Sequence, residues 1–177
     1  MINKVILNGT YGYENFISDD EKTYLVEWCN KNFKYFKKNN KGEGRYYIKL
    51  NQVNNSPLEL VKELKDRIIR LENIIDWIEE PLFSDYIGIN TRDGEIHPHR
   101  DPNVGKYIHT RYNIILSWPD NGGESIYGNN INVLYENLIW KCIAGKVKHA
   151  SKPVLGDKPR ITLSLGFLIN DHKVSII

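Results

Sequence analysis

Residues 138–167 read LIWKCIAGKVKHASKPVLGDKPRITLSLGF, and short apolar runs alternate with turn residues along this segment. The runs LIWKCIA, VKHA and ITLSLGF are rich in β-branched, aromatic and aliphatic residues, whereas AGK and LGDKP supply the Gly and Pro that tight turns need. The same alternation extends back towards residue 82 through DYIGIN, YIHTRYNIILSW, ESIY and INVLY. Many short strands at close spacing predict a β-barrel or β-sandwich in this half of the chain.

The first half of the chain carries helix signals instead. Ser18 and Glu21 match a capping box, and the residues that follow predict a helix over about residues 19–33. Residues 34–44 are polar and basic, and they have two interpretations: a solvated connection or a substrate-facing lid.

A second helix is predicted from Ser56 to about residue 80. Ser56 suits the N-cap, Pro57 suits the first helical position, and Glu59 lies three residues after the cap. Apolar residues then recur at three- and four-residue steps, as expected for a face that packs against a sheet: Leu60, Leu64, Ile68, Leu71, Ile75 and Ile78.

These patterns predict one α+β, mainly β domain over residues 1–177. A helical support layer, residues 1–81, is expected to back a double-stranded β-helix, the cupin-like jelly roll, over residues 82–177. The length of 177 residues and the hydrophobic content of 41% are sufficient for one compact core.

Composition argues against several classes of partner. Lys and Arg number 24 against 22 Asp and Glu, a net charge of +2, so charge gives no reason to expect nucleic acid or a membrane surface as a partner. No run of about 18 apolar residues is present, so no transmembrane helix is expected, and the first residues give no reason to expect a signal peptide. Cys29 and Cys142 have no neighbouring cysteine, which fits a reducing cytoplasm.

Residues 97–101, HPHRD, are the densest group of metal-capable side chains. His99 and Asp101 are two residues apart and would share one face of an extended strand, so both can meet one ion. His149, on or beside a later strand, adds a second imidazole, and two His with one carboxylate form the facial triad of non-haem iron(II) sites. His97 competes with His99, but only His99 has an Asp two positions later. A hydrogen-bonded turn pair is the alternative that needs no metal.

Arg160 and Thr162 follow His149 in the closing segment and would also share one strand face. An inward Arg beside a hydroxyl suits the distal carboxylate of a dicarboxylate such as 2-oxoglutarate, because a bidentate guanidinium–carboxylate pair is strong. Charge balance points the same way, since iron(II), Asp101 and a dianion would leave a buried site anionic without such a cation. A surface ion pair is the other interpretation of Arg160.

Three motifs occur in a fixed order: GEIHPHRD (94–101), NGGES (121–125) and the segment 138–167. Together they resemble the 2-oxoglutarate/iron(II)-dependent oxygenase superfamily, most of all its prolyl-4-hydroxylase-like branch and small phage or giant-virus members. The first resembles that branch's Gly-x-aromatic-x-Pro-His-x-Asp approach to iron, and the second resembles the Gly-Gly turn that follows. The third resembles the closing segment with its distal His, turn, basic residue and final strand.

The resemblance implies a set of cofactors and the residues that bind them. Iron(II), 2-oxoglutarate as co-substrate and O2 are implied, with ascorbate as an optional supporting reductant. The implied iron ligands are His99, Asp101 and His149. The implied co-substrate residues are Arg160, Thr162, Asn113, which resembles the polar residue that steadies the co-substrate, and Arg111, which would share a strand face with Asn113.

The chain also departs from that branch. Ile115 occupies the position at which prolyl hydroxylases use a Tyr beside the distal carboxylate, and Ile96 replaces the aromatic residue in the approach to iron. Arg160 stands where collagen-type members use Lys. A prolyl substrate therefore does not follow from the resemblance.

The expected function is a 2-oxoglutarate- and iron(II)-dependent dioxygenase, in the cytoplasm (of the host, if the chain is viral), that hydroxylates a peptide side chain or a small molecule and forms succinate. The presence of Asp101 argues against a halogenase. One alternative is a nucleic-acid oxidative demethylase, although only Arg160-Ile161-Thr162 is present of the longer Arg-rich motif of that class. A non-catalytic jelly-roll metal or binding protein is the other. Neither the substrate nor the oligomeric state can be predicted from the sequence.

Overall fold

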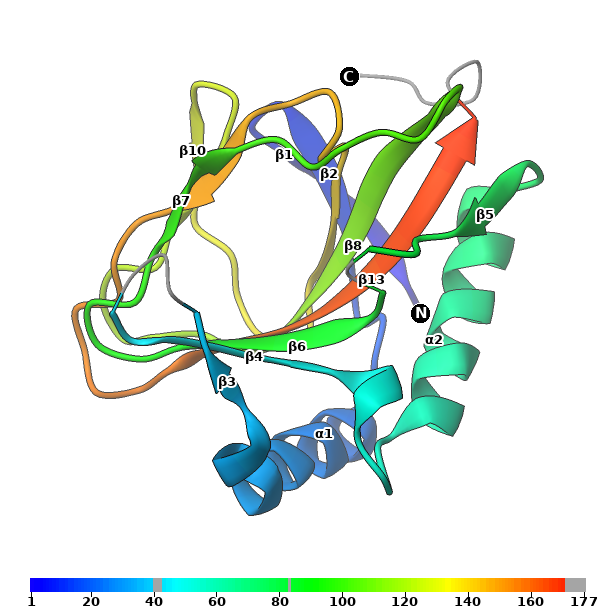
Figure 1. The fold of residues 1–177 in the computed structure, drawn as a ribbon. Helices are drawn as coiled ribbons and strands as arrows, with labels where there is room; N and C mark the ends of the chain where they lie inside the picture. Colours follow the sequence, from blue (N-terminus) through cyan, green and yellow to red (C-terminus); the bar gives the residue numbers. More distant parts are fainter. Residues whose placement is uncertain (40–42, 83, 171–177) are drawn as a thin grey trace.

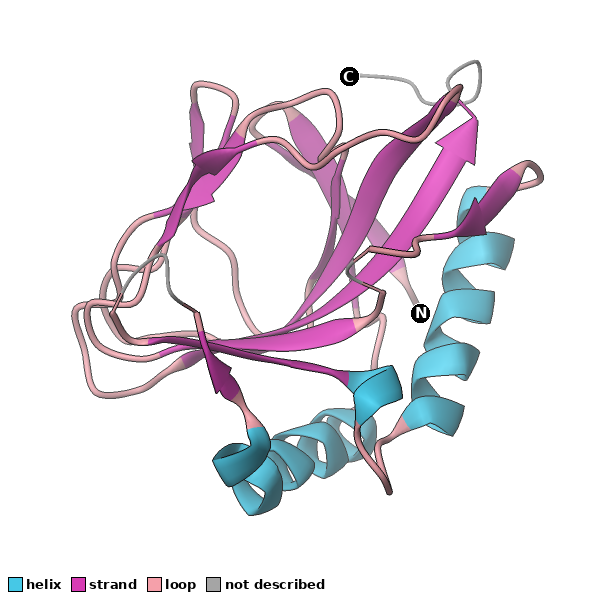
Figure 2. Ribbon diagram, in the orientation of Figure 1, coloured by secondary structure: helices cyan, strands magenta, loops and turns pink. Residues whose placement is uncertain are grey.

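The computed structural model describes residues 1–39, 43–82 and 84–170. Two antiparallel sheets lie opposite each other, and helices α1 and α2 cover the outer side of the larger sheet (Figure 1). Figure 2 shows that helix is confined to this side of the molecule, while the other side is built of strands and loops. The prediction of a mainly β, α+β fold with supporting helices is confirmed. Within the described ranges, no helix is long and apolar enough to cross a membrane.

The larger sheet has the strand order β1-β2-β11-β8-β13-β6-β4-β3, with β5 paired to β13, and the smaller sheet has the order β10-β9-β12-β7. The larger sheet consists of β1 (Asn3–Leu7), β2 (Thr10–Glu14), β3 (Lys37–Lys38), β4 (Arg45–Lys49), β5 (Trp77–Glu79), β6 (Tyr86–Asn90), β8 (Tyr107–Ser117), β11 (Ile139–Cys142) and β13 (Arg160–Asn170). The smaller sheet consists of β7 (Ile96–His99), β9 (Ser125–Tyr127), β10 (Asn130–Asn132) and β12 (His149–Ser151).

Helix α1 (Asp19–Asn32) begins where its capping box predicts. The Glu21 amide donates to the Ser18 hydroxyl over 3.1 Å, and the Glu21 carboxylate accepts from the Ser18 amide over 2.7 Å. These two bonds satisfy amide groups that the first turn of a helix leaves unpaired. A short 3-10 turn (Phe33–Tyr35) then leads into β3, so part of the predicted polar loop is strand. Residues 40–42 of that loop lie outside the described residues.

Helix α2 (Leu58–Glu72) is shorter than predicted at both ends. Pro57 is its N-cap, and the Ser56 hydroxyl makes no hydrogen bond. At the other end Asn73 adopts φ 50°, a left-handed conformation that Asn tolerates and that stops the helix. The apolar stripe that suggested an end near residue 80 continues into β5, where Ile78 is 42% exposed.

The first 81 residues contribute strands as well as helices. Strands β1 and β2 extend one edge of the larger sheet, and β4 extends the other beyond β6. The description of residues 1–81 as a helical layer was therefore incomplete, because these strands are short and lie at or near sheet edges, where alternation is weak. A second 3-10 turn (Leu50–Gln52) follows β4. Of the predicted run INVLY, only the first two residues are in a strand, β10.

Strand β13 has one face in the main hydrophobic core and the other face towards the smaller sheet. Its odd-numbered residues, such as Leu163 and Leu165, are fully buried in the main hydrophobic core with Leu25 of α1 and Leu64 of α2. The even-numbered residues at its start point to the opposite face, towards the smaller sheet. Packing of the helices therefore fixes the strand whose other face carries Arg160 and Thr162.

A buried polar cluster ties the end of α2 to three strands. The Glu72 carboxylate accepts hydrogen bonds from the hydroxyls of Tyr11 (2.5 Å), Tyr112 (2.9 Å) and Tyr13, and from the Lys141 ammonium (3.0 Å). The Glu72 side chain is only 6% exposed and that of Lys141 11%. Because every donor converges on one carboxylate, the cluster depends on Glu72.

We expect Glu72→Ala to lower the free energy of unfolding by about 3–5 kcal/mol, since it leaves the buried Lys141 charge without its partner. Urea unfolding monitored by circular dichroism measures this change. The matched control is Glu63→Gln on the same helix, whose side chain is 63% exposed and pairs with Arg67. Its expected effect is below about 0.5 kcal/mol. Equal effects of the two substitutions would contradict a structural role for the cluster.

Candidate metal centre and co-substrate pocket

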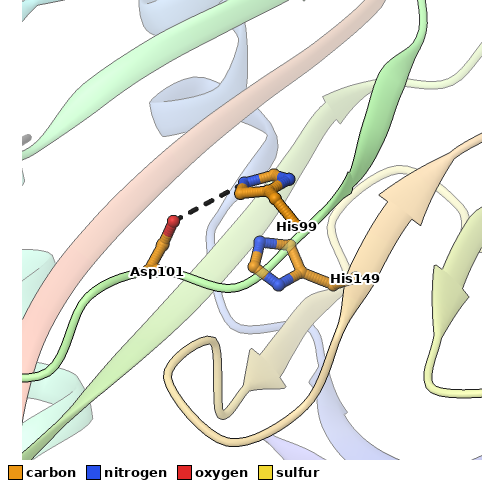
Figure 3. A group of neighbouring side chains, drawn as sticks. All are labelled: His99, Asp101 and His149. Atoms are coloured by element: carbon orange, nitrogen blue, oxygen red, sulfur yellow. Dashed lines mark ion pairs between the residues drawn. The ribbon is translucent and has the colours of Figure 1, made fainter.

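Two neighbouring strands and one loop bring His99, Asp101 and His149 together (Figure 3). β7 and β12 pair so that His99 lies directly opposite His149, and the two imidazole centroids are 4.3 Å apart. Asp101 follows β7, and its Oδ1 lies 3.5 Å from Nε2 of His99. One ligand atom from each residue lies within 4.8 Å of the others. This donor set suits a non-haem iron(II) ion and leaves coordination positions open.

The two imidazoles present the nitrogen that a metal needs. Nδ1 of His99 contacts the carbonyl oxygen of His97 at 2.7 Å, and Nδ1 of His149 contacts that of Val147 at 3.3 Å. A carbonyl oxygen can only accept, so each Nδ1 carries a proton and Nε2 is the ring nitrogen left to bind a metal. His97 itself is 56% exposed, lies 3.8 Å from the Glu95 carboxylate and is not part of the donor group.

Electrostatics favour the ligand forms of Asp101 and His149. Burial disfavours the charged form of Asp101, but the hydrogen bond to His99 and the charges of His109 and Arg111 hold the pKa of Asp101 well below its usual range. Burial lowers the pKa of His149 to about 4, so this ring is neutral at pH 7. The pKa of His99 is raised, chiefly by its hydrogen bond with Asp101. A carboxylate and a neutral imidazole are the forms that bind a metal.

A buried network lies behind Asp101. The Arg111 guanidinium contacts Oδ2 of Asp101 through Nε at 3.4 Å and Oε2 of Glu80 through Nη2 at 3.0 Å. Nε2 of His109 lies 3.6 Å from the same oxygen of Asp101. Arg111, which was predicted to hold the co-substrate, lines the cavity, and its guanidinium also pairs with Asp101 and Glu80.

Sequence reasoning missed Glu80 and His109, which are 2% and 0% exposed. His109 carried a signal, because it lies two and four residues before Arg111 and Asn113 on one strand and therefore shares their face. Glu80 follows β5 and carried none, since its contact with Arg111 joins segments 31 residues apart.

One cavity of about 480 Å³ adjoins the three ligands. His99, Asp101 and His149 line it, as do all four residues predicted to hold the co-substrate: Arg111, Asn113, Arg160 and Thr162. Arg160 and Thr162 share the face of β13 that the sequence predicts. Ile115 is fully buried in a separate apolar cluster, so this position gives the cavity no hydroxyl.

Arg160 is a buried cation beside this cavity. It is 5% exposed, and its Nη1 and Nη2 donate to the Gly123 carbonyl and the Ser125 hydroxyl, each over 3.0 Å. In the described part of the chain no carboxylate pairs with it, and its Nε has no hydrogen-bond partner. Burial lowers the pKa of Arg160 to about 10, which still leaves it charged at neutral pH. The guanidinium also lies over the Trp118 ring, with its carbon 5.3 Å from the ring centroid, and a buried cation of this kind favours an anionic ligand.

The fold can be compared with known proteins. No protein-family model and no curated protein sequence matches the chain. A viral collagen prolyl hydroxylase from Paramecium bursaria Chlorella virus-1, solved as its 2-oxoglutarate complex, superimposes with a TM-score of 0.66 at 13% identity, covering 92% of this chain and 96% of that one. A prolyl hydroxylase from Trichoplax adhaerens, in complex with a hypoxia inducible factor peptide fragment, gives 0.66 at 13% identity over 94% and 86% of the two chains.

A third structure of this kind is HygX from Streptomyces hygroscopicus with nickel and 2-oxoglutarate bound. Its TM-score is 0.65 at 12% identity, over 91% of this chain and 83% of HygX. These identities are low, so the similarity concerns the fold, and it confirms the predicted jelly roll. The chain thus has the jelly-roll fold found in prolyl hydroxylases and other 2-oxoglutarate/iron(II) oxygenases.

Proposed function

We propose that the chain is a 2-oxoglutarate- and iron(II)-dependent dioxygenase that hydroxylates a peptide side chain or a small molecule. One observation carries the proposal: Arg160, buried and without a counter-ion among the described residues, lines the same cavity as a His–Asp–His donor group. The donor group alone suggests only a metal. A cation without a counter-ion in the same cavity adds the need for an anionic co-substrate, and 2-oxoglutarate supplies both a chelating end and a distal carboxylate.

Each residue has a defined task in this proposal. His99, Asp101 and His149 hold the ion on one side and leave the cavity side open. Arg111 and His109 fix the orientation of the Asp101 carboxylate. Arg160, with Thr162 and Asn113 on the adjoining wall, binds the distal carboxylate and sets the direction of the co-substrate. The bound ion and co-substrate supply the oxidising chemistry, in which 2-oxoglutarate is decarboxylated to succinate as O2 is consumed.

Burial of the site serves this chemistry. Asp101 and Arg160 are 9% and 5% exposed, so their charges act in a medium that weakens them less than water does. The Trichoplax adhaerens prolyl hydroxylase compared above binds a peptide fragment, which by analogy supports a peptide substrate.

The test is succinate formation by anaerobically reconstituted protein that is then exposed to O2 and 2-oxoglutarate. We expect succinate with iron(II) and none with zinc(II), because zinc has no redox chemistry. A panel of candidate substrates then identifies compounds that accelerate turnover. Protein that neither binds iron(II) nor forms succinate would be a non-catalytic jelly roll, and the proposal would be wrong.

A further inference from the structure

Arg45 lines the cavity from β4, in addition to Arg111 and Arg160. Arg45 lies opposite Asn90 of β6, and Asn90 lies opposite Arg160 of β13. Directly opposed residues of antiparallel strands point to the same face, and all three residues line the cavity. The backbones of Arg45 and Arg160 are therefore two strand spacings apart, about 10 Å. Arg45 therefore lines the cavity from β4, and Arg160 lines it from β13.

No acidic residue in the described part of the chain pairs with Arg45. It makes no hydrogen bond or ion pair with any described residue, although it is only partly exposed. Asp101 is the sole acidic residue on the cavity wall of the described chain, and its carboxylate already contacts His99, His109 and Arg111. Lys49, further along β4, also lines the cavity, and its ammonium donates to the Leu82 carbonyl.

The charge of Arg45 acts on the metal ligand His99 and on Arg160. The pKa of His99 is raised chiefly by Asp101, and Arg45 opposes that rise. Burial is the main cause that lowers the pKa of Arg160, and Arg45 lowers it further. Arg45 also lines the same cavity as His99 and Arg160.

The proposed ligands do not neutralise Arg45. Iron(II) and Arg160 are balanced by Asp101 together with the two carboxylates of 2-oxoglutarate, and Arg111 is balanced by Glu80. The distal carboxylate is assigned to Arg160 and the near carboxylate to the metal. Arg45 is then a cation left over in a partly buried cavity, where an unpaired charge is unfavourable.

We propose that Arg45 recognises an oxyanion, a carboxylate or a phosphate, on the primary substrate of the enzyme. The inference rests on the proposed function, because it assumes that 2-oxoglutarate occupies the Arg160 side. Tyr47, two residues along β4, shares the cavity face and lies opposite Gly88, which leaves room above the sheet for the rest of the substrate. The substrate class is thus an anionic small molecule or an acidic side chain.

The direct test uses protein loaded with zinc(II) and N-oxalylglycine, an unreactive analogue of 2-oxoglutarate. The arginine Nε–H resonances are followed by NMR while benzoate, phenyl phosphate or benzamide is added. We expect benzoate, phenyl phosphate or both to shift the Arg45 signal saturably and benzamide to leave it unchanged. Whichever anion binds more tightly identifies a carboxylate or a phosphate as the preferred group. The Arg45 signal is assigned by its loss in Arg45→Gln.

Two outcomes would overturn the inference. One is the absence of any shift with either anion, and the other is an equal shift with benzamide. N-oxalylglycine must itself shift the Arg160 signal when it is first added. If it does not, the proposed function fails at that step, and the inference about Arg45 fails with it.

Turnover gives a second measurement. Candidate substrates are added in matched pairs that differ only in one group, a carboxylate against a carboxamide or a phosphate against an alcohol. We expect the anionic member of a pair to stimulate succinate formation at least about tenfold more than the neutral one. Arg45→Gln should bring the two members within about twofold of each other. Lys38→Gln on β3 is the matched control, because it removes the same charge from a residue outside the cavity. A preference that persists in Arg45→Gln would contradict the assignment.

Discussion

His99→Ala is expected to weaken metal binding and to reduce succinate formation by at least about 100-fold. Loss of residues that only orient metal ligands already costs about 10–100-fold, and His99 is itself a proposed ligand. The substitution removes one partner of the buried Asp101 carboxylate but leaves its pairing with Arg111, and the His99 side chain itself is 41% exposed. The fold should therefore survive, so a loss of metal can be separated from a loss of structure.

His97→Ala is the matched control. This histidine is two residues away on the same strand, but its ring is 56% exposed and is not part of the donor group. Titration with manganese(II), followed by electron paramagnetic resonance, compares the metal affinity of the two variants. We expect His97→Ala to stay within about threefold of the wild type, since only the His97 carbonyl contacts His99. If His97→Ala lost the metal and His99→Ala kept it, the ligand assignment would be reversed.

The sequence was most informative where the chemistry is local. His99 and Asp101 are two residues apart, and so are Arg160 and Thr162. Strand periodicity alone therefore predicts that the members of each pair share a face. The capping box at Ser18 likewise predicts the first residue of α1. These features depend on neighbours in sequence, and the structure places them as the sequence suggests.

The features that sequence reasoning missed depend on pairing between distant strands. Arg45 and Arg160 face one cavity only because β4, β6 and β13 pair in one register. Glu80 meets Arg111 because the segment after β5 returns to β8. A shift of one residue in either register would turn these side chains to the opposite face, and no local pattern specifies that register.

Arg160→Gln is expected to raise the KM for 2-oxoglutarate at least about 30-fold, while metal affinity in the absence of co-substrate stays within about threefold. Truncating one partner of a buried charge pair costs about 2–5 kcal/mol, and the lower value corresponds to about 30-fold. The metal ligands come from β7, β12 and the loop after β7, so the substitution on β13 leaves them in place. Arg160→Lys keeps the charge but not the bidentate geometry, and its KM should lie between the two.

A thermal readout separates co-substrate binding from a structural role of Arg160. In the wild type, metal with N-oxalylglycine should raise Tm, because a ligand that binds only the folded state stabilises it. In Arg160→Gln that increase should be lost, whereas Tm without ligand should change little, since the substitution removes a buried cation that has no counter-ion in the described chain. Arg92→Gln is the matched control, because this arginine is 59% exposed and pairs with Asp157 at the surface. If Arg160→Gln lowered the ligand-free Tm steeply and left the ligand-induced increase intact, Arg160 would be a structural residue. The 2-oxoglutarate assignment would then lose its main support.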